Sequence, residues 1–329
     1  SVTTIGSGVF EGCDKLESVE LPSSITNVEI PEDATEIGSG SFSGLTNITS
    51  VTIPESVTTI GAGAFEGCEK LEDVTIPAGV TTIEENAFAG SGLKEMTFDS
   101  TPETIAAGAF PEGVAKLSIK DPDEWCGVNA AEPILGTNGS LYVDGKKVDE
   151  LTLNPEGKTV GSYAFANTDI EKASITADEI GEGAFSGSAI EKVCLNVSTI
   201  GKDAFAGCEN LLHIYSLSEV PPVVDASSFP DTDFMWMYVP TGSAEAYKAA
   251  EPWNKYYIIE DTPENLKAYY DGTLEDPSTG IDEIQATGTQ GEETFYNLSG
   301  IAVGNDLRSL QPGVYVGRSS NGIRKIVIR

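Results

Sequence analysis

The sequence predicts a repeat solenoid: parallel short strands stacked on one face, closed by a C-terminal cap and followed by a small all-β domain. Three observations support this fold class. The apolar motif LxxVxIP recurs along the chain, phenylalanine recurs in register with it, and 20 to 23 residues separate successive phenylalanines within a run. A unit this short cannot bury its own apolar side, so parallel copies must stack and share one continuous core.

The clearest copy of the unit begins at Leu71. Its apolar residues Val74 and Ile76 alternate with polar residues, which predicts a short strand with one buried face. Pro77 cannot donate a hydrogen bond to a neighbouring strand and therefore ends this one. We expect such strands at residues 16–21, 48–53, 71–76, 93–98, 114–119, 170–175, 190–195 and 211–216. The phenylalanines in register are Phe10, Phe42, Phe65, Phe88, Phe110, Phe165, Phe185 and Phe205.

Two segments depart from the regular pattern. Residues 25–31 repeat the strand motif a few residues after the first predicted strand, with no phenylalanine between them. We expect there a partial duplication that bulges from the stack. An insertion at about residues 120–155 interrupts the array. Within it, Asp144-Gly145 predicts a two-residue hairpin turn over residues 141–148.

The repeat array is expected over residues 1–216. Residues 217–260 lose the repeat and gain aromatic residues, which predicts a capping unit over the open end of the core, with a short helix after Ser243. The same aromatic residues also fit a sugar-stacking platform, a less economical explanation. Residues 261–280 are expected to form a helical turn and a linker, and residues 281–329 a small β-sandwich-like tail.

Composition excludes several classes of partner. The chain has 52 acidic and 19 basic residues and a net charge of −33, so nucleic acid and anionic membranes are poor partners. No stretch of 18 apolar residues predicts a membrane span. The sequence opens in the middle of the repeat pattern, and we therefore expect a fragment from which a signal peptide has been trimmed.

Five cysteines, an odd number without close pairs, argue against a disulfide framework. Three of them, Cys13, Cys68 and Cys208, follow the Phe-x-Gly step of their units, where other copies carry Leu45 or Ser91. A position that accepts small or apolar side chains predicts buried free thiols rather than reactive ones.

The pattern IxxxAFxGCxxLxxVxIP resembles the BspA-like leucine-rich repeats of bacterial surface proteins, over about residues 1–260. The insertion, with Trp125-Cys126, resembles the habitual interruption in that family, and Tyr238-Val-Pro-Thr-Gly-Ser resembles its closing unit. The resemblance implies a secreted or cell-surface binding or adhesion protein whose partner is a host or matrix protein or a glycan. It implies no catalytic residues. The tail resembles the secretion-sorting β-sandwich of anaerobe surface proteins, which implies export by that route.

Catalytic chemistry has little support in the sequence. His213 is the only histidine, which excludes a two-histidine metal site and makes any histidine-based triad depend on one repeat residue. The common nucleophile, phosphate-binding and zinc-protease motifs do not occur. We therefore expect no catalytic residue, no metal and no cofactor. Paired carboxylates are common in so acidic a chain and are weak evidence for a glycosidase.

The outward positions of the predicted strands define one candidate binding site. The residues on either side of the central apolar position point outward together. Along the stack they begin polar or acidic and become basic, with Lys116, Lys172, Lys192, His213 and Tyr215 on the later strands. Neighbouring strands lie about 4.8 Å apart, so Lys172, Lys192 and His213 are expected to form adjacent cations that hold an anionic glycan or an acidic protein patch, with Tyr215 as a flat surface. The alternative is that each lysine pairs with a nearby acid of its own repeat.

The predicted function is therefore a surface-binding module. A polysaccharide-associated enzyme or accessory module, using the strand face or the insertion around Trp125, is the alternative, and a structural spacer is a third. A deep cleft with two carboxylates within about 10 Å of each other would favour the enzyme. A broad, shallow face would favour binding.

Overall fold

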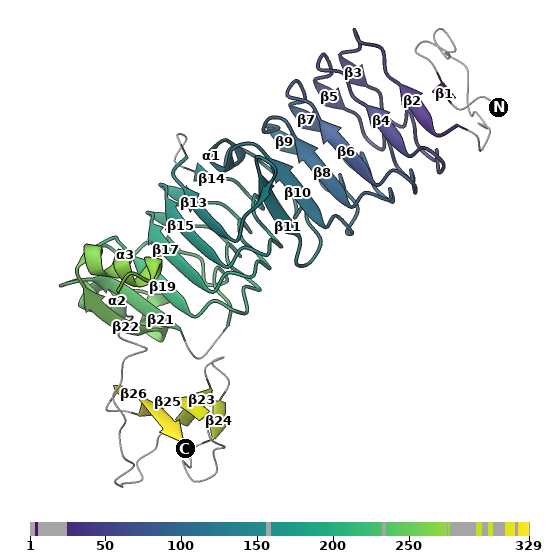
Figure 1. The fold of residues 1–329 in the computed structure, drawn as a ribbon. Coiled ribbons are helices and arrows are strands. Elements are labelled where there is room, and N and C mark those ends of the chain that lie inside the picture. The colour runs from purple at the N-terminus through teal and green to yellow at the C-terminus, as the bar shows by residue number, and fades with distance from the viewer. Residues whose placement is uncertain are drawn as a thin grey trace.

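The computed structural model describes residues 4–5, 25–155, 159–231, 235–274, 276, 294–297, 302–304, 313–319 and 322–328, and its strands form the successive rungs of an elongated stack (Figure 1). Most turns contribute one strand to a front face and a two-residue strand to a back face. The front face comprises β1 (Thr4–Ile5), β2 (Asn27–Glu29), β4 (Ser50–Thr52), β6 (Asp73–Ile76), β8 (Glu95–Phe98), β10 (Lys116–Ile119), β11 (Ser140–Val143), β13 (Glu150–Leu153), β15 (Lys172–Thr176), β17 (Lys192–Asn196), β19 (His213–Ser216), β21 (Trp236–Pro240) and β22 (Tyr257–Asp261). The back face comprises β3 (Glu36–Ile37), β5 (Thr59–Ile60), β7 (Thr82–Ile83), β9 (Thr104–Ile105), β14 (Thr159–Val160), β16 (Glu179–Ile180), β18 (Thr199–Ile200) and β20 (Val223–Val224).

Neighbouring strands of both faces pair in parallel, apart from the antiparallel β12 (Lys146–Lys147). The front face divides into three sheets, with orders β1-β2-β4, β6-β8-β10-β11-β12 and β13-β15-β17-β19-β21-β22. The back face divides into two, β3-β5-β7-β9 and β14-β16-β18-β20. The remaining elements are α1 (Pro122–Trp125), α2 (Ala244–Ala249), η1 (Trp253–Lys255), α3 (Pro263–Asp271), β23 (Thr294–Asn297), β24 (Ala302–Gly304), β25 (Gly313–Ser319) and β26 (Gly322–Ile328). The last four strands form an antiparallel sheet of order β24-β23-β25-β26.

The predicted solenoid is confirmed. Each strand predicted between residues 48 and 216 is present on the front face, within two residues of its expected bounds. The strand predicted at 16–21 lies outside the described residues. The expectation that residues 25–31 bulge from the stack is wrong, because Val28 of β2 lies opposite Val51 of β4 in a parallel ladder. Val28 is buried, so the alternating apolar pattern of this segment builds an ordinary rung.

The core is a column of stacked phenylalanine rings. In the first half, the ring centroids of successive residues from Phe42 to Phe110 lie 5.0–5.7 Å apart. In the second half, the column from Phe165 continues to Phe229 at spacings of 5.3–5.4 Å. Phe229 belongs to the segment predicted as the cap, so the repeat core extends further than the sequence motif. Offset stacking of this kind adds about 0.5–1.5 kcal/mol per pair to the burial of each ring.

The insertion continues the stack. Leu141 of β11 lies opposite Leu117 of β10 in a parallel ladder, and the chain then reverses into β12. Asp144 and Gly145 adopt φ values of +48° and +75°. Positive φ at both central residues identifies the type I′ turn that joins tightly twisted hairpins, and this confirms the predicted hairpin.

Trp125 closes the core between the two phenylalanine columns. Its ring is 1% exposed, lies 4.9 Å from the ring of Phe98, and donates a hydrogen bond from Nε1 to the carbonyl oxygen of Ala164 at 2.8 Å. The next turn follows so closely that a Cβ on Gly161 would lie 1.9 Å from the carbonyl oxygen of Val128. Only glycine fits there without backbone movement.

Two aromatic side chains plug the C-terminal end of the core. Tyr247 on α2 and Trp253 on η1 are fully buried. Tyr247 donates a hydrogen bond to the carbonyl oxygen of Ser218 at 2.8 Å, and the Trp253 indole donates to that of Pro222 at 2.9 Å. Rings held in this way are closed to a sugar ring, so they act as a plug and not as a stacking platform.

Helix α3 lies within the segment that the sequence assigned to a helical turn and linker. It packs across the front face over β17, β19 and β21 (Figure 1). Its N-terminus is capped by Thr262, and it ends at Gly272, whose φ of +72° is typical of a helix C-cap. Leu266, Tyr269 and Tyr270 form its buried side.

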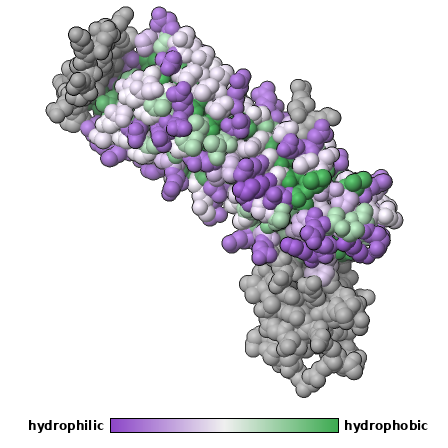
Figure 2. Space-filling view, turned by 180° about the vertical axis from the view of Figure 1, so that it is seen from behind, coloured by the Kyte–Doolittle hydropathy of each residue, from purple (hydrophilic) through white to green (hydrophobic). Residues whose placement is uncertain are grey.

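The described surface is mostly polar. Seen from behind, hydrophilic residues are spread along the stack with smaller hydrophobic stretches between them (Figure 2). Val220 and Val223, near the C-terminal end of the array, are the most exposed of the large apolar residues described, at 73% and 71%. Within the described residues, no helix combines the length and apolarity needed to cross a bilayer.

Candidate ligand-binding face

The sheet register brings three of the predicted site residues together. Lys172 on β15 lies opposite Lys192 on β17, and Lys192 lies opposite His213 on β19. The same row starts with Glu150 on β13. Lys116 belongs to another sheet, on β10, and therefore to a separate part of the front face.

Lys116 matches the alternative in which a lysine simply pairs with a neighbouring acid. Its Nζ lies 2.8 Å from Oε2 of Glu95, the residue opposite it on β8, and 4.8 Å from the centroid of the Tyr142 ring. The hydrogen bond to Glu95 raises the pKa of Lys116 above its usual value. Because the charge of Lys116 is already engaged, this residue is a weak candidate for an anion contact.

Lys172 and Lys192 differ from Lys116 in this respect. Both are half-buried, and neither forms an ion pair within the residues that the structure describes. Other lysines of the array do form such pairs, with acids on the adjacent turn. The distances are 2.7 Å for Lys94–Glu72, 2.8 Å for Lys120–Asp99 and 3.6 Å for Lys202–Glu182. Two lysines opposite each other, neither in a described ion pair, are thus the main electrostatic feature of this part of the front face.

His213 does not supply the third cation that the sequence suggested. Burial lowers its pKa to about 4, and the nearby carboxylate of Asp276 only partly opposes this shift. Its Nδ1 lies 3.3 Å from the hydroxyl oxygen of Tyr238 and 3.7 Å from Oδ2 of Asp276. At neutral pH the ring is therefore uncharged and takes part in a polar cluster beside the lysines.

Tyr215 is fully buried, so its ring is not the flat, solvent-facing surface that the sequence suggested. It stacks on Tyr238 at 4.4 Å and donates a hydrogen bond of 2.6 Å to Asp276. Tyr270 of α3 meets its ring edge-on at 6.0 Å. Helix α3 covers this part of the face, and the covering helix is what the strand pattern alone could not reveal. The signal was present in Leu266, Tyr269 and Tyr270, whose spacing predicts an apolar stripe on a helix.

Cys68 and Cys208 are buried, as predicted, and so are the other two described cysteines. Cys68, Cys126, Cys194 and Cys208 are free thiols at 0–2% exposure, and Cys13 lies outside the described residues. Burial raises the pKa of Cys68, Cys194 and Cys208 to about 11 and also raises that of Cys126. Thiols in this state are poor nucleophiles.

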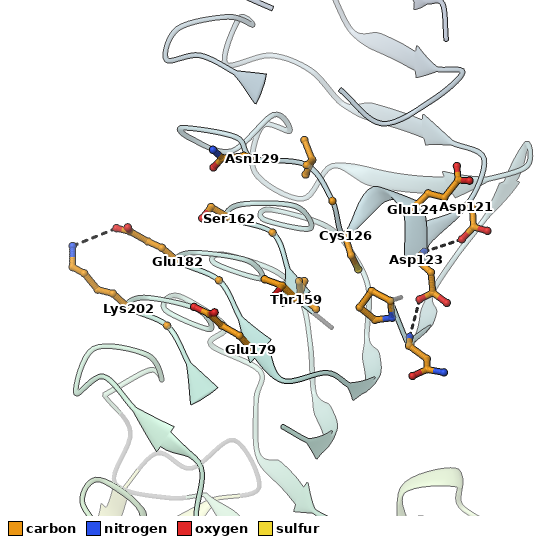
Figure 3. Close-up of a pocket in the computed structure, with 18 residues that line it drawn as sticks. Asp121, Asp123, Glu124, Cys126, Asn129, Thr159, Ser162, Glu179, Glu182 and Lys202 are labelled. Atoms are coloured by element: carbon orange, nitrogen blue, oxygen red, sulfur yellow. Dashed lines mark hydrogen bonds and ion pairs between the residues drawn. The ribbon is translucent and has the colours of Figure 1, made fainter. Parts of the chain in front are cut away.

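A hollow of about 930 Å³ lies between α1 and the strands β14 and β16 (Figure 3). Its walls carry the acidic side chains of Asp121, Asp123, Glu124, Glu179 and Glu182. Two of these are committed to the fold: Asp121 accepts a hydrogen bond from the backbone N–H of Asp123, and Asp123 accepts one from the backbone N–H of Asn154, at 2.8 and 2.7 Å. The described residues contain no group of three metal-binding side chains.

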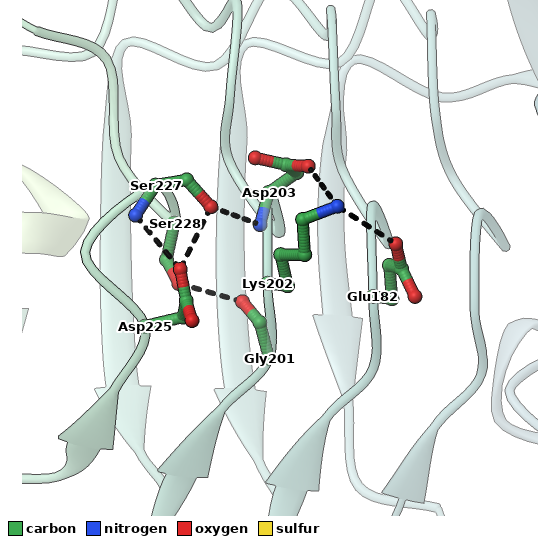
Figure 4. A network of polar contacts seen from close by, with 7 residues as sticks. All are labelled: Glu182, Gly201, Lys202, Asp203, Asp225, Ser227 and Ser228. Atoms are coloured by element: carbon green, nitrogen blue, oxygen red, sulfur yellow. Dashed lines mark hydrogen bonds and ion pairs between the residues drawn. The ribbon is translucent and has the colours of Figure 1, made fainter.

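The one lysine in this hollow is engaged in a surface network (Figure 4). Lys202 lies 3.6 Å from Glu182 and 3.3 Å from Asp203, and the backbone N–H of Asp203 donates to Ser227 at 3.3 Å. Ser227 in turn donates to Asp225 at 2.8 Å. These bonds link three successive turns and therefore have a structural role. The ring of Trp125, proposed for a polysaccharide site, is buried in the core next to this hollow and is closed to a ligand.

The fold defines this protein as a parallel-strand repeat solenoid. The chain belongs to the family of the BspA type leucine rich repeat region, whose model matches six copies over residues 1–113 and 141–233. No curated protein matches. Solved structures with a similar chain course include a leucine-rich repeat protein from Eubacterium ventriosum (18% identity, 72% of this chain and 73% of that chain, TM-score 0.38). A second is a leucine rich cell surface protein from Faecalibacterium prausnitzii (19% identity, 82% of this chain and 86% of that chain, TM-score 0.36). A third is the pneumococcal vaccine antigen PcpA (17% identity, 72% of this chain and 80% of that chain, TM-score 0.34).

Proposed function

We propose that this protein is a secreted or cell-surface binding module that recognises an acidic segment of a partner protein through Lys172 and Lys192. The observation that carries the proposal is the pair of adjacent lysines without a described ion-pair partner, in a chain of net charge −33. Location at the surface is what membership of the BspA-type family leads us to expect. Family membership likewise supports a role in binding rather than catalysis.

The surroundings of the lysines favour a partner with few negative charges. Glu150 lies opposite Lys172 on the neighbouring strand, and glutamates 171 and 191 directly precede the two lysines in the sequence. A long polyanion such as a sulfated glycan would bring many negative charges against this acidic surface and would be repelled. One or two carboxylates on a protein can reach both ammonium groups without that cost.

The experiment compares the double variant Lys172→Glu/Lys192→Glu with the double variant Lys94→Glu/Lys120→Glu, which makes the same change of charge at lysines already paired with acids. Each purified protein is tested against an array of matrix proteins and an array of sulfated and acidic glycans. We expect the first variant to lose at least tenfold in affinity for a protein that the unaltered chain binds, and the second to lose less than twofold. Equal loss in both variants, or binding to glycans alone, would overturn the proposal.

A further inference from the structure

The front face over β17, β19 and β21 carries an apolar cluster that is separate from the solenoid core. On the sheet it comprises Cys194, Tyr215, Trp236 and Tyr238, and on α3 it comprises Leu266, Tyr269 and Tyr270. The phenylalanine column and its neighbours form a different cluster on the other side of the same strands. Because the two clusters are distinct, α3 packs on the front face and not in the core of the solenoid.

A buried carboxylate fastens the segment that follows α3 to the same face. Asp276 is 6% exposed and accepts hydrogen bonds from the hydroxyl groups of Tyr215 and Tyr238 at 2.6 and 2.7 Å. Its Oδ2 lies 3.7 Å from Nδ1 of His213. Two phenol hydroxyl groups that donate to one buried carboxylate form a built recognition site for an anionic group, and Asp276 occupies it.

Several features make the docked helix easier to release than a core element. Helix α3 has nine residues, a length at which an isolated helix is only marginally stable, so its order depends on docking. The hydroxyl group of Tyr270 is buried without a hydrogen-bond partner, which weakens the docked state. Helix α3 also lies on one face of the sheet only and contributes nothing to the stacked core.

We propose that α3 together with Asp276 is a releasable strap, which occupies a docking site on the front face for a partner helix that carries an aromatic stripe followed by a carboxylate. We infer the chemistry of this partner from that of α3 and Asp276, which occupy the site in this structure. In the closed state the strap covers Tyr215 and Tyr238, and in the open state their rings and hydroxyl groups become accessible. Lys172 and Lys192 take no part in this site, so the strap does not depend on the function proposed above.

The first test measures release directly by amide hydrogen exchange in the full chain. Asp276→Ala removes the acceptor of both tyrosine hydroxyl groups, and Glu264→Ala, an exposed acid in the first turn of the same helix, is the matched control. We expect Asp276→Ala to speed exchange of the α3 amides at least tenfold while the amides of β15 and β17 change less than twofold. Glu264→Ala should leave both groups within twofold. Exchange of α3 only together with the β17 amides, in every variant, would show that the helix is part of the core and would overturn the proposal.

The second test asks whether the docking site accepts a helix from outside. The probe is a fluorescently labelled peptide with the sequence of residues 262–276, added to the unaltered chain and to Asp276→Ala. In the unaltered chain the tethered strap has a high effective concentration and should exclude the probe. Asp276→Ala should bind it at least tenfold more tightly, and a probe in which alanine replaces the aspartate at 276 should lose that gain. Equal binding of both probes, or no binding to the variant whose α3 amides have opened, would overturn the docking site.

Discussion

The phenylalanine column is the feature on which the stability of the array should depend most, and Phe185→Ala tests this. Phe185 is fully buried and stacked on both sides, on Phe165 at 5.4 Å and on Phe205 at 5.3 Å. Removing a fully buried phenylalanine ring costs about 3–5 kcal/mol in transfer and cavity terms together. The stability of a solenoid is close to a sum over neighbouring repeats, so most of this loss should fall on the turns before and after β17.

The matched control is Phe42→Ala. Phe42 is half-buried and, within the described residues, stacks on one ring only, that of Phe65 at 5.3 Å. Less buried area and one fewer described stacked neighbour should limit its loss to about 2 kcal/mol. Its effect should also stay in the first half of the array, because each repeat contacts only its neighbours.

Native-state amide exchange, read strand by strand, measures both variants. Since 1.4 kcal/mol corresponds to a factor of ten, Phe185→Ala should speed exchange of the β15, β17 and β19 amides roughly 100- to 4,000-fold. Urea unfolding followed by tryptophan fluorescence provides an independent measure of the same loss. A loss below about 1 kcal/mol for Phe185→Ala, or equal losses for both variants, would refute the view that the stacked column carries the stability.

Further predictions concern single residues. The NMR signal of His213, the sole histidine, should titrate near pH 4, and a midpoint near 6.5 would contradict its burial. Because the pKa of His213 in the folded state lies below its usual value of 6.5, its contribution to stability should fall as the pH drops from about 6.5 to 4. The four described thiols are those of Cys68, Cys126, Cys194 and Cys208. At pH 8 they should react with a thiol-specific reagent only after denaturant is added, which peptide mapping of the labelled protein would measure. Trp125→Phe should lower the free energy of unfolding by about 1–3 kcal/mol because it leaves the Ala164 carbonyl without its donor, and no measurable loss would show that this hydrogen bond is dispensable. Lys192→Ser removes a like-charge pair across β15 and β17 and should raise the free energy of unfolding by about 0.2–1 kcal/mol. Thermal unfolding at low salt would detect this gain, and a loss of stability would contradict the reasoning.

Most of the fold followed from the sequence because each unit repeats the same local physics. Alternation around Val74 predicts a strand, Pro77 ends it, and the register of the phenylalanines predicts the column. The rung at residues 25–31 was misjudged because it lacks a phenylalanine between itself and the preceding predicted strand. The strand motif alone, with Val28 in phase with Val51, was the better guide there.

The candidate site was predictable only in part. The register of Lys172, Lys192 and His213 follows from counting residues, since parallel copies place equivalent positions side by side. What covers those positions depends on segments remote in sequence. Tyr270 of α3 and Asp276 contact Tyr215 from 55 and 61 residues further along the chain. The neutral state of His213 follows from its burial. Sequence patterns report the spacing of outward residues and leave out what later packs on them.

The lysine pair on β15 and β17 lowers the stability of the free protein. Like charges directly opposite each other on neighbouring strands are destabilising, and in-register copies of a Glu-Lys step place Lys172 against Lys192. Lys116 lies opposite Glu95 and forms an ion pair with it. Lys172 also lies opposite a glutamate, Glu150, but forms no ion pair with it. A bound carboxylate between Lys172 and Lys192 would turn the repulsion into two favourable contacts. If the two lysines bind a carboxylate as proposed, the arrangement is unfavourable in the free protein and favourable in the complex, unlike a ladder of internal ion pairs.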